Sequence, residues 1–164
     1  MKILNQSQIR QKIRRLAYEI IENNYSDKHI ILAGINNNGV NFAKLLLKEL
    51  QKISDSNFIL TNLTLNPADP LSEPITIDLP LKEIKNKPII IIDDVANTGR
   101  TIFFALKPLL EILPKKVEAA VLVDRTHKSF PIKVDYVGLS LATTLKDNID
   151  VQLKGVEEMA VFLD

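Results

Sequence analysis

Two adjacent carboxylates, Asp93 and Asp94, directly follow a run of four isoleucines in the segment Ile89–Thr101. A small, hydroxyl-bearing turn comes next, and Arg100 and Thr101 then begin a predicted helix. Carboxylate oxygens accept hydrogen bonds from neighbouring hydroxyl groups, and the backbone N–H groups at a helix start favour an anion such as a phosphate. The segment therefore suits a phosphorylated sugar.

The acid pair by itself has other readings. Paired acids after a hydrophobic strand also occur in nucleotide-hydrolysing and metal-binding folds, and a purely structural turn is a further alternative. The Thr-Gly-Arg-Thr sequence that follows the acids makes the segment as a whole much more specific than the pair alone.

The elements that must position these residues alternate between strands and helices. Hydrophobic runs predict strands at His29–Ala33, Phe58–Leu65, Ile89–Asp93, Lys116–Asp124 and Val134–Leu139, with two short strands at Ile149–Leu153 and Met159–Leu163. Helical spacing predicts a first helix around Ile9–Ile20 capped by Ser7, a second from about Val40 to Ile53 after a loop from Gly34 to Gly39, and a third from about Arg100 to Leu113. Such alternation predicts an α/β fold with a doubly wound parallel sheet and flanking helices, which binds ligands above the carboxyl ends of its strands.

Composition narrows the class of protein further. The 164 residues suit one compact domain, 46% of them are hydrophobic and 25% are charged, and the formal net charge is +1. There is no cysteine, which excludes disulfides and thiol catalysis, and two histidines are too few for a convincing metal cluster. No apolar run approaches membrane-spanning length, so we expect a cytoplasmic protein without membrane partners.

The segment Ile89–Thr101 resembles the phosphoribosyl-pyrophosphate (PRPP) motif of type I phosphoribosyltransferases. A second segment, Ala120–Gly138, contains Val-Asp-Arg, a histidine, a basic residue, Pro-Ile and Asp-Tyr-Val-Gly. This order is typical of the bifunctional pyrimidine-operon attenuator and uracil phosphoribosyltransferase group, which the chain resembles most within the family. The resemblance implies the type I phosphoribosyltransferase fold over residues 1–164, with a small hood formed by the chain ends.

The resemblance also implies an activity and a set of site residues. The enzyme would transfer ribose 5-phosphate from PRPP to a nucleobase, by resemblance uracil, and release Mg²⁺-bound pyrophosphate. Asp93 and Asp94 would act as the catalytic residues by holding the ribose hydroxyls, with Mg²⁺ bound near them through PRPP. The implied PRPP-binding residues are Asp93, Asp94, Val95, Ala96, Asn97, Thr98, Gly99, Arg100 and Thr101. The implied pyrophosphate loop is Ile35, Asn36, Asn37, Asn38 and Gly39, and the implied residues near the base are Arg125, His127, Val137 and Gly138.

Three segments depart from the pattern of this group. Asparagines replace the basic residues of the pyrophosphate loop, and they cannot supply the positive charge that strengthens hydrogen bonds to a polyanion. The expected mobile lid, Thr64–Asp69, lacks the tyrosine and arginine of the group, and Leu139–Thr144 differs near the base. The identity of the base stays open, and Lys82, Lys85 and Lys87 are candidates for a replacement charge.

These departures are also compatible with an alternative function. A catalytically weak protein that binds PRPP or a nucleotide for regulation would keep the sugar-phosphate site and lose the contacts to pyrophosphate. An RNA-binding pyrimidine-operon attenuator is a further alternative, which the near-neutral net charge disfavours because phosphate contacts supply most of the affinity for RNA. Family members commonly form dimers or larger assemblies, so the resemblance also implies a homo-oligomer.

Overall fold

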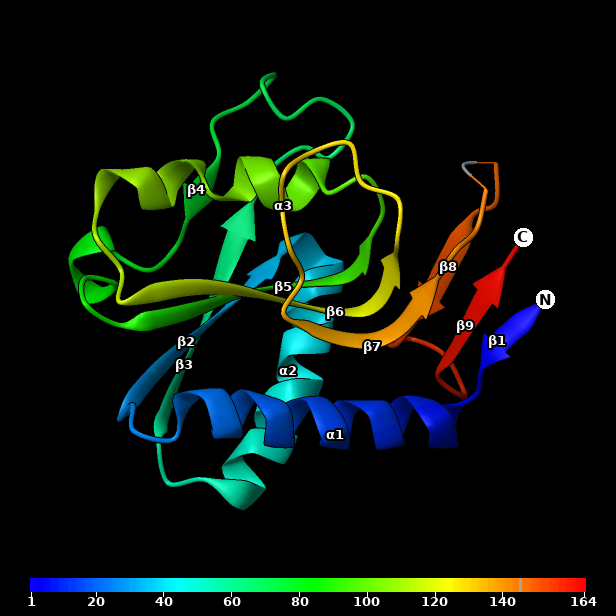
Figure 1. Cartoon of the computed structure of the whole chain (residues 1–164), viewed down its shortest axis with the longest axis horizontal. Coiled ribbons are helices and arrows are strands. Elements are labelled where there is room, and N and C mark those ends of the chain that lie inside the picture. Colours follow the sequence, from blue (N-terminus) through cyan, green and yellow to red (C-terminus); the bar gives the residue numbers. More distant parts are fainter. Residues whose placement is uncertain (145) are drawn as a thin grey trace.

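A six-stranded sheet forms the centre of the molecule in a computed structural model that describes residues 1–144 and 146–164. Its strand order is β4-β3-β2-β5-β6-β7 (Figure 1). The strands are β2 (His29–Ile35), β3 (Asn57–Thr64), β4 (Thr76–Ile77), β5 (Pro88–Ala96), β6 (Lys116–Arg125) and β7 (Tyr136–Leu141). Only the β3–β4 pair is antiparallel among the pairs in this sheet, so the predicted doubly wound, mostly parallel sheet is confirmed.

Two long helices, α1 (Gln6–Asn24) and α2 (Asn36–Ile53), cover one face of the sheet (Figure 1). The predicted cap of the first helix is wrong, because Asn5 takes that place instead of Ser7. The Asn5 side chain accepts a hydrogen bond from the Gln8 backbone, and the Gln8 side chain accepts one from the Asn5 backbone, each at 2.9 Å. This reciprocal pair satisfies two N–H groups that the helix start leaves free.

The opposite face is covered by a shorter helical segment than the sequence predicts. Helix α3 spans Arg100–Ala105 and the 3-10 helix η2 spans Lys107–Glu111, where we expected one helix up to Leu113. Pro108 explains the difference, because proline lacks the N–H that an α-helix needs at that point and restricts the residue before it. A second 3-10 helix, η1 (Leu81–Glu83), precedes β5.

The buried residues of the sheet alternate between two hydrophobic clusters. Ile90 and Ile92 pack with α1 and α2, whereas Ile89 and Ile91 pack with α3 and η2. Because β5 is buried on both faces, it reads as the continuous isoleucine run seen in the sequence. Asp93 and Asp94 follow this run near the carboxyl end of β5, where their side chains interact with each other.

The chain ends form a separate three-stranded antiparallel sheet, which confirms the predicted hood. It consists of β1 (Lys2–Leu4), β9 (Ala160–Leu163) and β8 (Ile149–Gln152), in the order β1-β9-β8. The Met1 amino group donates to the Leu163 carbonyl at 2.7 Å, and the Leu163 N–H donates to the Met1 carbonyl at 2.8 Å. Figure 1 shows the hood beyond the carboxyl ends of β5 and β6, where it can complete a site.

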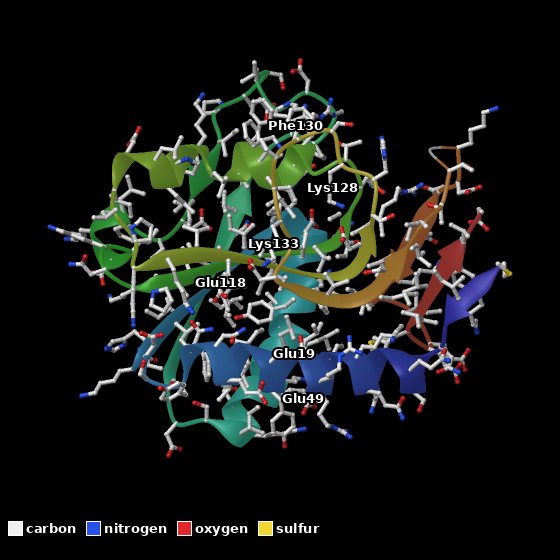
Figure 2. All side chains as sticks on the ribbon, in the orientation of Figure 1. Glu19, Glu49, Glu118, Lys128, Phe130 and Lys133 are labelled. Carbon is white, nitrogen blue, oxygen red and sulfur yellow. The ribbon has the colours of Figure 1, made fainter. Side chains whose placement is uncertain are left out.

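Polar and aromatic contacts secure the elements around β6. The Tyr136 hydroxyl donates to the Glu118 carboxylate at 2.9 Å beside α1, and burial raises the pKa of Tyr136. On the other side of the sheet, Phe130 packs against Phe103 and Phe104 of α3, with ring centroids 5.4 and 6.1 Å apart. Figure 2 shows Glu118 on the α1 side and Phe130 on the segment that arches towards α3.

None of the described helices is both long and apolar enough to cross a membrane.

Candidate functional site

The two acids are held at the end of β5 by their own backbone. One carboxylate oxygen of Asp93 accepts a hydrogen bond from the Asp94 N–H at 2.9 Å, and one of Asp94 accepts from the Val95 N–H at 2.8 Å. These short-range bonds fix the orientation of both side chains before any ligand arrives. Each carboxylate has a second oxygen that can accept a hydrogen bond from a hydroxyl group.

Burial makes these carboxyl groups hold their protons more strongly than exposed aspartates do. It raises the pKa of Asp93 well above the ordinary value of 3.8, and the neighbouring charge of Asp94 raises it further. Burial also raises the pKa of Asp94, against hydrogen bonds that lower it. A raised pKa in paired carboxyls beside a pocket is typical of a functional site.

A pocket of about 380 Å³ lies next to the acids, lined by Pro67 and by the segment from Val95 to Ile102. Gly99 has a φ of 87°, and a side chain placed there would put its Cβ 2.6 Å from Ile132 Cγ1. Only glycine fits this turn without strain. The Thr98 carbonyl accepts hydrogen bonds from the N–H groups of Ser129 and Phe130 at 2.9 and 3.2 Å, which holds the turn from outside.

The Arg100 side chain has a role that the sequence did not indicate. Its guanidinium donates to the carbonyls of Pro67 and Ala68 at 2.6 and 3.4 Å. Arg100 therefore ties the irregular segment 65–75 to the turn that lines the pocket. Its backbone N–H, by contrast, lies in the turn and faces the Thr98 hydroxyl at 3.4 Å.

The expected loop from Gly34 to Gly39 is wrong. Strand β2 continues to Ile35 and helix α2 begins at Asn36, so the implied pyrophosphate loop is the first turn of a helix. Asn36 has a φ of 53°, its amide donates to the Leu65 carbonyl at 2.8 Å, and its side-chain oxygen accepts from the Leu65 N–H at 3.1 Å. This asparagine is therefore engaged in joining α2 to the end of β3.

The rest of that turn is available to a ligand. Asn37 and Asn38 are exposed, and Gly39 packs so closely that a Cβ would lie 2.5 Å from the Ile92 carbonyl oxygen. The close approach brings the start of α2 against the end of β5, beside the acids. The replacement charges considered from the sequence are elsewhere, because Lys82, Lys85 and Lys87 lie at or before the amino end of β5. A nine-residue strand is about 30 Å long, so these lysines are at the far end of the sheet.

The residues expected near the base differ in burial and in the contacts that they make. Arg125 is only 4% exposed and donates to the Asn97 side chain at 3.0 Å and to the carbonyls of Thr144 and Asp147 at 2.6 and 2.7 Å. It thereby joins the turn that lines the 380 Å³ pocket to the segment leading into the hood. His127 is exposed.

Val137 and Gly138 lie in β7, and their carbonyls both accept hydrogen bonds from Arg15 of α1 at 2.9 Å. A Cβ at Gly138 would lie 2.4 Å from the Leu122 carbonyl oxygen, so this glycine allows β7 to pack closely on β6. The observed contacts of these two residues are thus with the protein's own helix and strand.

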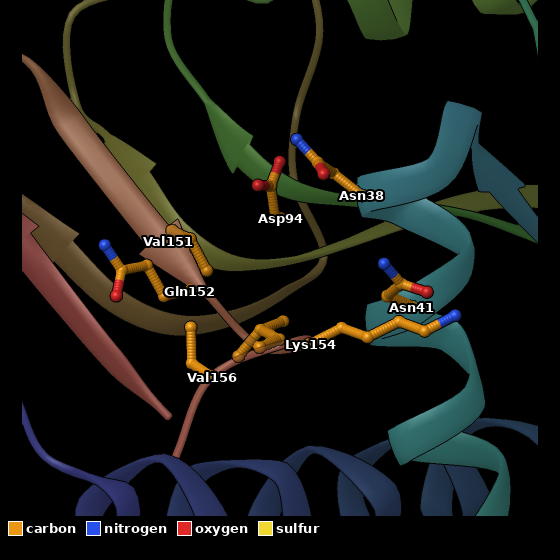
Figure 3. A pocket seen from close by; sticks show the side chains of 8 residues that line it. Asn38, Asn41, Asp94, Val151, Gln152, Lys154 and Val156 are labelled. Atoms are coloured by element: carbon orange, nitrogen blue, oxygen red, sulfur yellow. The ribbon is translucent and has the colours of Figure 1, made fainter. Parts of the chain in front are cut away.

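A second pocket, of about 150 Å³, joins the hood to the acids. It is lined by Asn38 and Asn41 of α2, by Asp94, and by Val151, Gln152, Leu153, Lys154 and Val156 of the hood. Figure 3 shows Asn38 beside Asp94, with Lys154 extending from the hood towards α2 and passing Asn41. Sequence reasoning missed the hood residues, because nothing in the chain near position 154 indicates that it faces residues more than a hundred positions away.

The chain is similar to known proteins over most of its length. A family model for the phosphoribosyl transferase domain matches residues 2–156. The chain is 34% identical to the bifunctional protein PyrR of Bacillus pumilus over 95% of this chain and 92% of that protein. It is 36% identical to the bifunctional protein PyrR of Clostridium acetobutylicum over 96% and 92%.

Solved structures show the same fold at lower identity. A hypoxanthine-guanine phosphoribosyltransferase of Bacillus anthracis superposes with a TM-score of 0.74 at 17% identity, over 86% of this chain and 83% of that one. The hypoxanthine phosphoribosyl transferase of Trypanosoma cruzi superposes with a TM-score of 0.77 at 14% identity, over 98% and 90%. The match over nearly the whole length establishes that this chain belongs to the phosphoribosyltransferase family.

Proposed function

We propose that the protein transfers ribose 5-phosphate from PRPP to a nucleobase, which we take to be uracil, and releases pyrophosphate. The observation that carries this proposal is the pair Asp93 and Asp94 at the end of β5, beside a pocket built from a glycine turn. Hydroxyl acceptors next to a pocket lined by a glycine turn and a helix start match the two ends of a ribose 5-phosphate. Family membership supports the same substrate class.

In this proposal each part of the site acts by binding and positioning. Asp93 and Asp94 accept hydrogen bonds from the 2′- and 3′-hydroxyls of the ribose. The backbone N–H groups of Asn97–Thr101 and the two threonine hydroxyls hold the 5′-phosphate. Holding both ends of the sugar fixes its reactive carbon between the base and the leaving group, and no covalent nucleophile is required.

The acids also fit a Mg²⁺ ion that arrives with PRPP. Carboxylate oxygens are ligands that Mg²⁺ accepts, and this ion is usually held by one or two carboxylates together with substrate phosphates. When bound, Mg²⁺ would neutralise negative charge that develops on the pyrophosphate. The raised pKa values of Asp93 and Asp94 favour bringing a cation to this place, because a positive charge stabilises both ionised carboxylates.

The choice of uracil rests on the resemblance of Ala120–Gly138 to the bifunctional attenuator and uracil phosphoribosyltransferase group and on the similarity to PyrR proteins. Arg125, His127, Val137 and Gly138 are the proposed residues around the base. A single domain over residues 1–164, a cytoplasmic location and a homo-oligomer belong to the same proposal.

The test is pyrophosphate release from Mg²⁺–PRPP by the purified protein, with uracil, hypoxanthine, guanine, adenine, xanthine and orotate offered separately. We expect release with uracil, and loss of both release and PRPP binding in the double variant Asp93→Asn, Asp94→Asn. Circular dichroism of that variant serves as the control for folding. Retained PRPP affinity in calorimetry would overturn the site assignment.

A regulatory protein that binds PRPP or a nucleotide without turnover is the second candidate. Two observations favour it: the first turn of α2 contains asparagines without a basic residue, and the segment after β3 has no arginine or tyrosine at its lid position. Tight binding of uridine monophosphate, combined with no pyrophosphate release for any base, would support this candidate.

A further inference from the structure

The pocket between the hood and α2 is lined by hydrogen-bond donors and one lysine, which suit an anion, and by one acid. Asn38 and Asn41 present side-chain amides from α2, and Asp94 borders the pocket from the end of β5. Its volume of about 150 Å³ suits a small polar group. Lys154 supplies the positive charge in this lining (Figure 3).

Three other cations, in the glycine turn and at the end of β6, are already engaged. The Arg100 guanidinium bonds the Pro67 and Ala68 carbonyls, and Arg125 is buried against Asn97 and two further carbonyls. Lys128 forms an ion pair with Asp124. Among the residues that the structure describes, Lys154 has no carboxylate within 4.0 Å, so its charge is available to a ligand.

We infer that Lys154 binds the pyrophosphate leaving group, in a subsite that it shares with Asn38 and Asn41. This inference rests on the proposed transferase function and names the residue that replaces the missing charge of the α2 turn. Lys154 lines the same pocket from the hood instead of from the helix, and its side chain extends along α2 past Asn41. The divalent ion that accompanies pyrophosphate would neutralise the acid side of the subsite, and Asp94 is the residue that would hold it.

The asparagines and Lys154 would contribute hydrogen bonds of different strength to the same ligand. The asparagine amides donate neutral hydrogen bonds, which are weak towards a polyanion, whereas an ammonium group donates charge-assisted bonds. Removing Lys154 should therefore weaken pyrophosphate specifically, because the sugar-phosphate pocket is lined by a different segment, Val95–Ile102, together with Pro67. The loss expected for one charge-assisted bond is about tenfold or more in affinity.

The experiment compares Lys154→Gln with Lys154→Arg and with Lys44→Gln. Lys44 is an exposed lysine of α2 outside the lining of the pocket, so its substitution changes the net charge equally. Calorimetry with magnesium pyrophosphate and, separately, with ribose 5-phosphate gives the two affinities. We expect Lys154→Gln to lose about tenfold or more for pyrophosphate and to keep its affinity for ribose 5-phosphate, with Lys154→Arg and Lys44→Gln close to the original protein.

The outcomes separate this inference from the proposed function. Pyrophosphate affinity that is unchanged in Lys154→Gln, or an equal loss in Lys44→Gln, would overturn the role of Lys154. Absence of pyrophosphate binding to the original protein would overturn it as well. Turnover is scored independently: a protein that releases no pyrophosphate from PRPP with any base contradicts the transferase, while the binding comparison still decides whether Lys154 contacts pyrophosphate.

Discussion

The carboxyl group of Asp93 retains its proton to a higher pH than an exposed aspartate, because burial and the charge of Asp94 both disfavour ionisation. Its pKa is raised in the folded chain, so the folded state binds this proton more tightly than the unfolded chain does. The contribution of this proton to the free energy of unfolding is therefore fully present below pH 3.8, the ordinary pKa. It is lost as the pH rises through the raised pKa. Above that raised pKa the ionised acid opposes folding until a ligand compensates.

We therefore expect Asp93→Asn to raise the free energy of unfolding at neutral pH. Asparagine is close in shape, keeps a side-chain oxygen for the Asp94 N–H, and cannot ionise. The gain is about 1.4 kcal/mol for each unit by which the folded pKa exceeds the unfolded one. Urea unfolding at a series of pH values measures it, and the difference between the two proteins should disappear below about pH 3.8. A gain that persists at low pH would contradict the electrostatic explanation.

Gly99 allows a second prediction at a single position. Gly99→Ala meets both an unfavourable φ of 87° and a contact of 2.6 Å with Ile132, whereas Gly155→Ala meets a φ of 72° with no atom within 4 Å. The φ penalty alone is roughly 1–2 kcal/mol. Thermal unfolding of both variants should show the larger loss for Gly99→Ala, and equal losses would show that the turn relaxes away from Ile132.

At the scale of elements, Arg100 connects a helix start to the irregular segment after β3. Its partly exposed side chain holds that segment by donating hydrogen bonds to two carbonyls. We therefore expect its removal to release the segment more than it destabilises the fold. Hydrogen exchange of Arg100→Ala should accelerate in residues 66–75 and stay unchanged in β5. Arg10→Ala, a change on α1, is the matched control, and acceleration in both variants would point to a general loss of stability.

Much of the arrangement of elements could be predicted from the sequence, because isoleucine and valine runs identify buried parallel strands. The start of α2 could not. Gly34 and Gly39 looked like loop residues, but they are required because a Cβ would meet the Val40 backbone at 2.6 Å and the Ile92 oxygen at 2.5 Å. Close approach of one backbone to another leaves no periodic signal in the chain.

The same limit applies to the candidate site. The acid pair and the glycine turn are contiguous in sequence, so their resemblance to a known motif predicted them together. Lys154 and Asn38 meet only through the hood, and the Arg100 contact to Pro67 depends on how a proline-rich segment folds back. Contacts of this kind depend on tertiary packing and could not be derived from spacing.

For the whole molecule, the hood is the part that forms a sheet of its own. Strand β1 contributes one edge of the hood, and Leu4 is its buried residue. Deleting residues 1–4 should raise hydrogen exchange in β9 and leave β5 protected, because β5 lies inside the larger sheet. Affinity for ribose 5-phosphate should change little, and a large loss would show that the hood also shapes the sugar-phosphate pocket.

The pairing of Met1 with Leu163 joins positions 162 residues apart. During synthesis the first strand therefore waits for its partner until the last strand has left the ribosome, while β2, β5 and the glycine turn can already assemble. A chain in that state has the turn that lines the larger pocket before it has the pocket beside the hood. The order of synthesis thus delays completion of the second pocket until β1 and β9 pair.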